Sequence, residues 1–374
     1  MNIGFDYRLG GLGFAGIGRY ARELIFNILK IDKQNYYKIF FHPKTIAYDD
    51  KNILSRFDNV DLIPAPYKHY SFAEQTRFLK LLNDTKLNLV HFPHFNYPIL
   101  YKRPFVVTIH DVIHHRISGK HWTRKAKFEV YKQVITRAAQ NSEKIITISE
   151  VSKRDIMEYL KVPLSKIEVT YEGVSLAHKL PAQVEQVKKK YLIQKPYFIF
   201  VGRMEPRKNI PMLAQIFSDF LDKYKFDMEL VIVGKEDIHH PEEKERALQI
   251  KHANKIIFTG FASDDDLGAL YQGAYGFITT SFEEGFGLPG LEAIAMGIPV
   301  IAPDIPIYNE IYDNAALYYR TEDPEADMLD KMRFLCSDHK YYEELKMKTV
   351  KRAAEFSWYS CAAKTIKIYE STLK

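Results

Sequence analysis

The sequence predicts an α/β protein with two parallel-sheet domains. Short apolar runs with strand character alternate with segments of helical periodicity along all 374 residues, a pattern typical of parallel α/β folds. The chain is longer than one ordinary domain. Several predicted strands, such as Phe198–Val201 and Val231–Val233, are apolar on both faces, as expected for a sheet that helices cover on both sides.

The predicted strands of the first half are short runs rich in β-branched and aromatic residues: Asn2–Asp6, Lys38–Phe41, Val60–Ile63, Leu89–Phe92, Phe105–Ile109 and Lys144–Ile148. The same pattern in the second half predicts Tyr197–Val201, Glu229–Val233, Ile256–Thr259, Gly276–Thr279 and Pro299–Ala302. Helical spacing of apolar residues predicts helices between them, among them Ile17–Leu29, Phe72–Leu82, Arg124–Ala139, Ile210–Lys223 and Glu325–Leu335.

The boundary between the two domains is predicted near residues 175–195. Residues 176–190 are polar and charged, contain Pro181, and precede a new strand, which is typical of an inter-domain connection. We therefore expect an N-terminal domain over residues 1–178 and a C-terminal domain over residues 179–355. Residues 356–374 are expected to form a terminal helix that crosses back to the N-terminal domain.

Composition restricts the classes of protein that fit. No apolar run reaches the roughly 18 residues that a membrane-spanning helix needs, and the acidic Asp6 stands where a signal peptide would build its apolar region. The two cysteines, Cys336 and Cys361, have no metal-ligand spacing. This cysteine usage favours a reduced, cytoplasmic protein.

Charge is divided unevenly along the chain. Residues 1–180 carry 28 Lys and Arg against 17 Asp and Glu (+11), whereas residues 181–374 carry 25 against 30 (−5). The asymmetry suggests two domains with different partners, and a chance division of surface charge explains it equally well.

The segment Glu283–Ala293 carries the strongest functional signal. Its sequence E-E-G-F-G-L-P-G-L-E-A follows a predicted strand and predicts a glycine-rich turn and then a helix from about Leu288. Backbone N–H groups of such a turn face ligands at the carboxyl end of an α/β sheet. Glu284 precedes this helix and Glu292 lies within it, and carboxylates accept hydrogen bonds from sugar hydroxyls. A helix cap at Glu284 and a solvated Glu292 would explain the same residues without a ligand.

A second segment, V-G-R-M-E-P-R-K-N over residues 201–209, also follows a strand and precedes a helix. Arg203 and Lys208 are expected near the helix N-terminus, where the helix dipole already favours an anion. Two cations there would stabilise the charge on a departing nucleoside diphosphate. The alternative is a charged surface turn.

These segments, with A-P-D-I-P at 302–306 and A-A-L-Y at 315–318, resemble the retaining glycosyltransferases of family 4. The resemblance covers nearly the whole chain and implies the GT-B fold, in which two Rossmann-like parallel-sheet domains face each other across a cleft. The segment over residues 89–95 and the Gly-Ile-Gly-Arg-Tyr loop look most like bacterial mannosyltransferases of surface-polysaccharide assembly.

The resemblance also implies roles for the residues of both segments. Glu284 would contact the donor sugar, Glu292 would hold the ribose, and Arg203 and Lys208 would hold the diphosphate. The donor site would be completed by Gly202, Gly285, Phe286, Gly287 and Leu288. One position departs from the family, because Gly290 stands where an aliphatic residue is usual.

The loop Gly10–Tyr20 contains G-x-G-x-x-G at Gly11, Gly13 and Gly16, the fingerprint of dinucleotide-binding folds. The acidic residue expected at the end of the second strand is missing, since that strand ends I-F-F-H-P. An NAD site is therefore not favoured. The family resemblance instead implies that Gly16 and Gly18 approach the donor and that Arg19 lies on the acceptor side.

A His-Asp pair, His110 and Asp111, ends another predicted strand. By resemblance, His110 is the active-site histidine that contacts the donor sugar, and Asp111 supports the acceptor-side loop. The alternative is a histidine satisfied by the core. His91 and His94 also end a strand, lack further metal ligands, and are interpreted as acceptor-side or structural residues.

The function predicted from these features is retaining transfer of a hexose, with mannose favoured, from a GDP- or UDP-sugar to a glycan or a lipid-linked acceptor. We expect no cofactor, no metal and no nucleic-acid partner. The alternatives are a nucleotide-sugar epimerase of GT-B fold, which needs no acceptor, and a non-catalytic sugar-binding protein of periplasmic type, which needs a signal peptide.

Residues 116–144 further suggest docking on an anionic membrane surface at the inner face of the membrane. The segment carries two acids, Glu129 and Glu143, and eight basic residues: Arg116, Lys120, Arg124, Lys125, Lys127, Lys132, Arg137 and Lys144. Aromatic and aliphatic side chains, including Trp122, are interleaved with them. An ordinary amphipathic helix with Val130, Val134 and Ile135 in the core is the competing interpretation.

Overall fold

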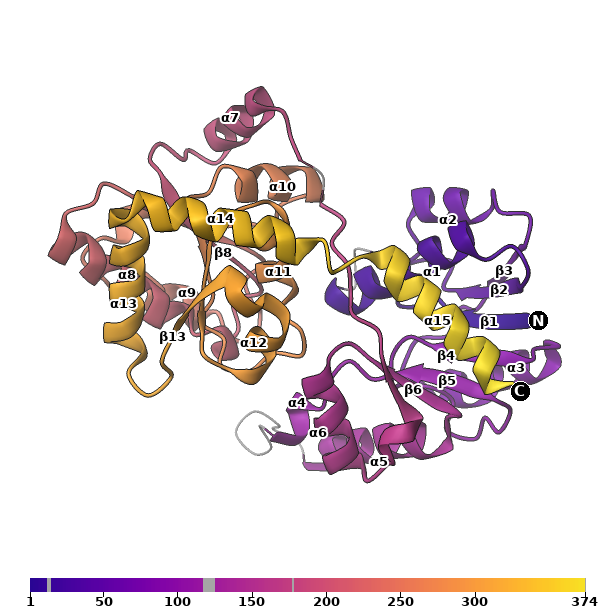
Figure 1. Ribbon diagram of the computed structural model, residues 1–374. Helices are drawn as coiled ribbons and strands as arrows, with labels where there is room; N and C mark the ends of the chain where they lie inside the picture. Colours follow the sequence, from indigo (N-terminus) through magenta and orange to yellow (C-terminus); the bar gives the residue numbers. More distant parts are fainter. Residues whose placement is uncertain (12–14, 117–124, 177, 374) are drawn as a thin grey trace. The chain divides into compact units, whose positions relative to one another are not determined.

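The computed structural model describes residues 1–11, 15–116, 125–176 and 178–373. The chain forms two compact units, Met1–Gly173 with Ser357–Lys374, and Val174–Phe356. Each unit contains one parallel sheet with helices on both faces (Figure 1). This confirms the predicted α/β class with two Rossmann-like sheets.

The first unit is built on a seven-stranded parallel sheet of order β3-β2-β1-β4-β5-β6-β7. Its strands are β1 (Asn2–Asp6), β2 (Tyr36–Phe41), β3 (Val60–Pro64), β4 (Leu89–Phe92), β5 (Phe105–Thr108), β6 (Lys144–Thr147) and β7 (Ile167–Val169). The chain moves outward from β1 to β3 and then returns to place β4 beside β1. The strand order therefore reverses between β1 and β4.

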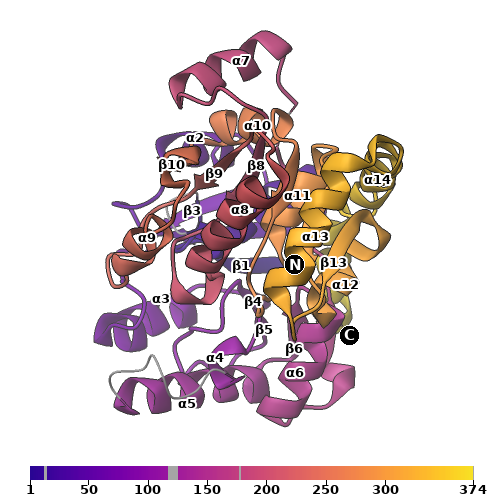
Figure 2. The same ribbon diagram turned by 90° about the vertical axis from the view of Figure 1, so that its left-hand side faces the viewer.

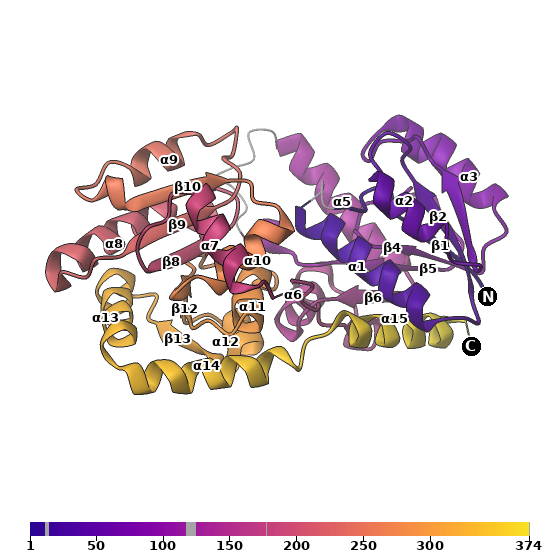
Figure 3. The same cartoon turned by 90° about the horizontal axis from the view of Figure 1, so that it is seen from above.

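Helices cover both faces of this sheet. On one face, α1 (Ala15–Ile31) and α15 (Trp358–Thr372) pack side by side (Figure 3). The other face holds a core formed with the π-helix η2 (Glu74–Phe78), α3 (Leu79–Asp84), α5 (Lys125–Asn141) and α6 (Glu150–Leu160). Three short elements complete the unit: α2 (Tyr48–Leu54), α4 (Ile113–Arg116) and η3 (Leu164–Lys166).

The second unit has a six-stranded parallel sheet of order β10-β9-β8-β11-β12-β13. Its strands are β8 (Tyr197–Val201), β9 (Glu229–Val233), β10 (Ile256–Gly260), β11 (Gly276–Ile278), β12 (Val300–Pro303) and β13 (Ala316–Tyr319). Here the order reverses between β8 and β11, which are hydrogen-bonded neighbours although they are far apart in the chain.

One face of the second sheet forms its main core with α8 (Ile210–Tyr224) and α13 (Pro324–Ser337). Helix α11 (Leu288–Ala295) contacts β11 and β12 and packs against α10 (Asp264–Gln272), α12 (Pro306–Tyr312) and α14 (His339–Ala353). Helix α7 (Pro181–Lys190) packs on α10 and lies beyond it from the sheet (Figure 2). The remaining elements are short: α9 (Glu242–Ala247), η4 (Pro206–Lys208), η5 (Ala253–Lys255) and η6 (Asp313–Ala315).

All eleven strands predicted from the sequence are present, with ends that agree within two residues. The three-residue β7 and the four-residue β13 were not predicted. The helix predicted over residues 72–82 begins as the π-helix η2 and becomes α-helical at Leu79.

The first unit ends at Gly173, five residues before the expected boundary at 178. A Cβ atom on Gly173 would lie 2.2 Å from the backbone nitrogen of Trp358, so only glycine fits where the outgoing chain passes the returning chain. This contact fixes the start of α15, which belongs to the first unit.

The basic segment over residues 116–144 is described only in part. Residues 117–124, and with them Lys120, Trp122 and Arg124, lie outside the described residues. Within α5, Ile135 is buried and Val134 is half-buried, but the Val130 side chain is 58% exposed. The interpretation that placed Val130 in the core is therefore wrong. Among the described helices, none is long and apolar enough to cross a membrane.

Candidate functional site

The three glycine-containing segments with functional signals lie at the two points where strand order reverses, and the His110–Asp111 pair follows β5, the neighbour of β4. Parallel α/β sheets bind ligands at the carboxyl ends of the strands beside such a point. In the second unit, residues 202–209 follow β8 and residues 279–287 follow β11. In the first unit, the loop after β1 leads into α1, and Pro93–Asn96 follows β4.

Glu284 is the centre of the cluster in the second unit. Its Oε1 atom pairs with the ammonium group of Lys208, and its Oε2 atom lies 2.9 Å from the guanidinium of Arg207. Burial alone would raise the pKa of Glu284, but the two cations outweigh burial and lower it to about 2. The carboxylate is therefore ionised at neutral pH and can only accept hydrogen bonds.

Arg207 belongs to this cluster and was not predicted as a site residue. Its guanidinium also pairs with Glu205 at 2.6 Å and donates to the backbone oxygen of Glu283 at 2.5 Å. The sequence shows Arg207 next to Lys208, but only the pairing of β8 with β11 brings it to Glu284. It ties the loop after β8 to the loop after β11.

Arg203 and Gly202 lie on the same loop. The Arg203 side chain is exposed and forms no ion pair with any residue in the described ranges. Gly202 lies against the loop after β9, where a Cβ on Gly234 would come within 1.9 Å of the Gly202 oxygen. Arg203 is therefore a cation available to a ligand at this edge of the sheet.

Glu292 is buried on α11, with 3% of its surface exposed. The hydroxyl of Tyr271 donates to its Oε2 atom at 3.1 Å and to the oxygen of Pro289 at 2.9 Å. The interpretation of Glu292 as a solvated helix residue is therefore wrong. The helix-cap interpretation of Glu284 is also wrong, because the N-cap of α11 is Gly287.

The glycine-rich turn is held from behind by a tyrosine. Gly285, Phe286 and Gly287 are buried, and Leu288 begins α11. Gly287 has a left-handed φ of 82°, and its oxygen accepts a 2.7 Å hydrogen bond from Tyr312.

The same tyrosine explains the departure from the family at Gly290. A Cβ on Gly290 would lie 2.2 Å from the Tyr312 hydroxyl. Tyr312 therefore fills the space that an aliphatic side chain would take.

In the first unit, His110 follows β5 and is held on two sides. Its Nε2 atom lies 3.1 Å from the oxygen of Pro93, and its ring meets the Tyr20 ring edge-on at a centroid distance of 4.7 Å. Its Nδ1 atom lies 3.8 Å from Glu172. Burial lowers the pKa of His110, so the ring is neutral at pH 7, and donation to Pro93 leaves Nδ1 as a hydrogen-bond acceptor.

The loop between β1 and α1 approaches the same edge of the first sheet. Gly11 has a positive φ of 102° and donates from its backbone to the oxygen of Gly18 at 3.1 Å. Gly16 is exposed, Gly18 is buried, and Arg19 is half-buried on α1. Residues 12–14, which include the predicted Gly13, lie outside the described residues.

Two further predicted positions have structural contacts. Asp111 accepts a 3.0 Å hydrogen bond from the backbone of Ile113 and so supports the start of α4. His91 is fully buried in hydrogen bonds to Tyr369 and Thr108, which is the structural alternative for that residue. His94 is half-buried, and burial lowers its pKa to about 3. Among the described side chains, no group of three or more His, Cys, Asp or Glu could hold a metal ion.

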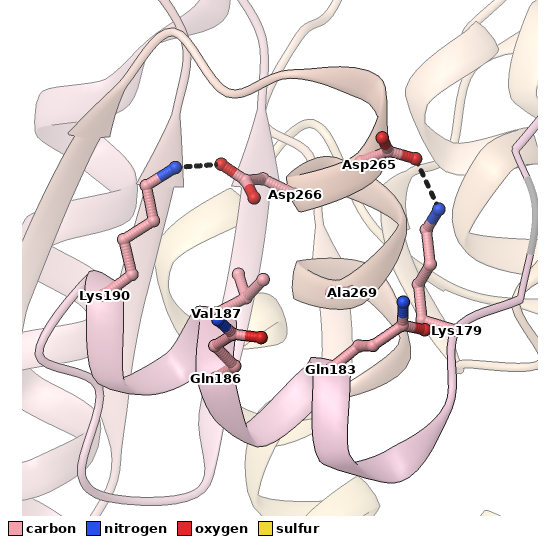
Figure 4. A pocket seen from close by; sticks show the side chains of 8 residues that line it. All are labelled: Lys179, Gln183, Gln186, Val187, Lys190, Asp265, Asp266 and Ala269. Carbon is pink, nitrogen blue, oxygen red and sulfur yellow. Dashed lines mark hydrogen bonds and ion pairs between the residues drawn. The ribbon is translucent and has the colours of Figure 1, made fainter.

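A separate pocket of about 500 Å³ lies between α7 and α10 (Figure 4). Its two lysines, Lys179 and Lys190, are already paired with Asp265 and Asp266 at 2.5 Å each. None of the residues of the two functional segments lines it. We assign it no ligand.

Two Rossmann-like sheets in one chain, each with polar loops at its strand reversal, define a protein of the GT-B class. Residues 183–352 match the family Glycosyl transferases group 1, and residues 15–178 match Glycosyltransferase Family 4. Together the two matches cover most of the chain, which therefore belongs to the glycosyltransferases that these two family models describe and is a glycosyltransferase, as the sequence predicts.

Relatives and solved structures agree with this assignment. O-antigen chain mannosyltransferase B of Escherichia coli is 26% identical over 95% of this chain and 96% of its own length. O-antigen chain mannosyltransferase RfbU of Salmonella typhimurium is 27% identical over 74% of this chain and 72% of its own. These names give no support to the epimerase alternative.

The fold is shared with solved glycosyltransferases. A glycosyltransferase from Rickettsia africae superposes with a TM-score of 0.73 at 20% identity, covering 100% of this chain and 98% of that chain. Anabaena HepE in complex with UDP and glucose gives a TM-score of 0.75 at 15% identity, covering 99% and 100%.

Proposed function

We propose that this glycosyltransferase moves mannose, with retention of configuration, from GDP-mannose to a hydroxyl of a glycan or a lipid-linked acceptor. The carboxylate of Glu284, fixed between Arg207 and Lys208 where the strand order reverses, is the observation that carries the proposal. The mannosyltransferase names of the relatives support the choice of sugar.

The donor would be held by the second unit. Lys208 and the exposed Arg203 would bind the diphosphate, and the buried carboxylate of Glu292 would accept hydrogen bonds from the ribose hydroxyls. Glu284, ionised at neutral pH, would accept hydrogen bonds from hydroxyls of the sugar. The backbone of residues 285–288, just before and at the first turn of α11, would face the donor.

The transfer would take place on one face of the sugar. The bond from the anomeric carbon to the phosphate oxygen breaks, the acceptor oxygen bonds to the same carbon from the face just vacated, and the acceptor proton moves to the departing phosphate. Positioning and charge stabilisation are then the work of the protein. We propose that Arg203 and Lys208 supply the positive charge that a metal supplies in other enzymes.

The first unit carries the other residues of the proposal. A neutral His110 would contact the donor sugar through its acceptor nitrogen Nδ1, and Asp111 and Arg19 would lie on the acceptor side. A shift in the melting temperature tests the donor directly, since binding to the native state raises apparent stability.

The experiment is a thermal-shift panel with GDP, UDP, GDP-mannose and UDP-glucose, followed by proton NMR of the glycosidic product. We expect stabilisation by GDP and GDP-mannose and an α-linked product from the α-configured donor. Stabilisation by the uridine compounds alone would reject GDP-mannose, and a β-linked product would reject retention.

The metal question has its own experiment. We expect turnover to survive an excess of EDTA, because the chain supplies the cations. Complete loss with EDTA and recovery with added Mn²⁺ or Mg²⁺ would overturn metal independence.

We also propose that the first unit docks on an anionic membrane surface through the basic segment over residues 116–144. On α5, the Val130 side chain is exposed, and the ring of Phe128 lies beneath Lys132, with its centroid 4.4 Å from the Lys132 ammonium. Both observations support this proposal. Basic residues near such a surface contribute about 1 kcal/mol each. Co-sedimentation with anionic vesicles should fall with salt and with neutralisation of Lys120, Arg124, Lys125 and Lys127. Equal recovery with neutral vesicles contradicts it.

A further inference from the structure

A hydrogen-bond network of four buried polar side chains, called the network below, connects α15 with α1 in the first unit. The hydroxyl of Tyr369 lies 2.6 Å from Nδ1 of His91, and Nε2 of His91 lies 2.8 Å from the Thr108 hydroxyl. The Thr108 hydroxyl lies 3.1 Å from the hydroxyl of Tyr20. Tyr20 is on α1, Tyr369 is on α15, and the two central residues belong to β4 and β5.

All four side chains are shielded from water, with exposed fractions of at most 1%. Burial lowers the pKa of His91 to about 3, so its ring is neutral and one nitrogen donates while the other accepts. A hydroxyl can do either, so both tautomers of His91 are fully hydrogen-bonded. Apolar residues of similar shape would fill the same space without the cost of burying polar groups, so packing does not by itself require this network.

The network ends at Tyr20, whose ring contacts the residue that the proposed mechanism uses, His110. Tyr20 is anchored through its hydroxyl, and its ring meets the His110 ring at an interplanar angle of 85°. The second contact of His110 is the backbone oxygen of Pro93, two residues after His91. Two contacts of His110 are therefore linked to His91, the Tyr20 ring through hydrogen bonds and the Pro93 oxygen through two residues of backbone. Glu172, 3.8 Å from Nδ1 of His110, lies outside this network.

We propose that Tyr369, on the C-terminal helix α15, is a positioning residue that orients His110 through His91, Thr108 and Tyr20. This inference rests on the proposed role of His110 at the donor sugar. Loss of the Tyr369 hydroxyl leaves one nitrogen of His91 without a partner and removes the link between the network and α15. The hydrogen bond between Thr108 and Tyr20 then loses its connection to α15, and we expect the Tyr20 ring to shift, and His110 with it.

The test compares two buried tyrosines. Tyr369→Phe removes the first hydroxyl of the network, and Tyr97→Phe removes a hydroxyl that is equally buried in the same unit but accepts a 3.3 Å hydrogen bond from Asn141. We expect Tyr369→Phe to lower kcat about tenfold, in the range that small misplacements of catalytic groups produce, with little change in KM for the donor. Tyr97→Phe should leave kcat unchanged, although both variants lower the melting temperature.

Thr108 supplies a second test in the middle of the network. Thr108→Val keeps the shape and loses the hydroxyl, whereas Thr108→Ser keeps the hydroxyl. We expect Val to reproduce the loss in kcat and Ser to restore most of it. This pair decides the matter even if Tyr369→Phe does not fold.

The double variant Tyr369→Phe with His110→Ala distinguishes the positioning role of Tyr369 from the proposed role of His110. If Tyr369 acts through His110, Tyr369→Phe should cause no further loss in a His110→Ala background, because coupled residues are not additive. Two results would overturn the positioning role and leave the proposed function intact. The first is full kcat in Tyr369→Phe and Thr108→Val while His110→Ala is impaired. The second is that the losses of Tyr369→Phe and His110→Ala add up in the double variant. Full activity in His110→Ala would instead remove His110 from the proposed mechanism, and the positioning role with it.

Discussion

Lys208 and Glu284 form an ion pair across 76 residues of sequence, joining the loop after β8 to the loop after β11. Arg207 pairs with the same carboxylate and also with Glu205, so two cations and two anions balance within this cluster. The exposed Arg203 on the same loop forms no ion pair with the described residues, and its charge would be balanced by a diphosphate. The ion pair with Glu284 holds the Lys208 ammonium in a fixed place beside that position.

Removal of either proposed diphosphate cation should nearly abolish transfer. Lys208→Ala and Arg203→Ala each take away a positive charge aimed at the leaving group, and loss of one such preorganised group costs about 3–4 kcal/mol of transition-state stabilisation. Initial rates at saturating donor measure the effect. Lys223→Ala, an exposed lysine on the last turn of α8, is the control and should behave as wild type. Near wild-type turnover in either site variant contradicts the assignment.

The two carboxylates should separate in their kinetics. Glu284→Gln is expected to lower kcat, because in the proposed mechanism Glu284 contacts the sugar on which charge develops, whereas Glu292→Gln should mainly weaken nucleotide binding. Calorimetric titration with the nucleoside diphosphate measures the second effect. Equal affinity for wild type and Glu292→Gln would show that Glu292 does not hold the ribose.

Glu284 should also make the free energy of unfolding depend on pH. Its pKa falls from 4.5 to about 2 on folding, so its ionised form stabilises the native state fully above pH 4.5. That stabilisation is lost as the pH falls toward 2. The difference in urea stability between wild type and Glu284→Gln should therefore shrink between pH 5 and pH 3. A difference that stays constant over this range would mean that the carboxylate is not held by its cations.

Gly290 and Tyr312 should behave as a coupled pair. Gly290→Ala places a methyl group against the Tyr312 ring, and such overpacking costs about 1–3 kcal/mol. We expect Tyr312→Leu to recover part of this loss in the double variant, because it removes the clashing hydroxyl. Unfolding by denaturant on the two single variants and the double variant gives the coupling. Strictly additive changes would show that Tyr312 does not occupy the Gly290 position.

The sheets could be predicted from the sequence because their strands are local apolar runs. The strands β7 and β13 were missed for different reasons. Residues Ile167–Val169 give too short a run to show a period. Residues Ala316–Tyr319 carry a family motif, but two alanine residues weaken the apolar run at Ala315–Leu317, so the pattern does not predict a strand.

The site was predictable only residue by residue. Glu284 and Lys208 stand at predicted strand–helix junctions, and Glu292 lies within the predicted helix that follows Glu284, so their place at the sheet edge could be inferred. Their partners could not. Tyr271 reaches Glu292 from α10, and Arg207 reaches Glu284 through the pairing of β8 with β11. Such contacts depend on strand order, which the period of a sequence does not contain.

The contact between Gly173 and Trp358 has a consequence for biosynthesis. Since the second unit is inserted between these residues, a growing chain contains the strands of the first sheet early but lacks α15 until the whole second unit has been synthesised. His91 and its partner Tyr369 are 278 residues apart. Domains fold as units during synthesis, so the second unit can finish folding before the first, although the synthesis of the first starts earlier.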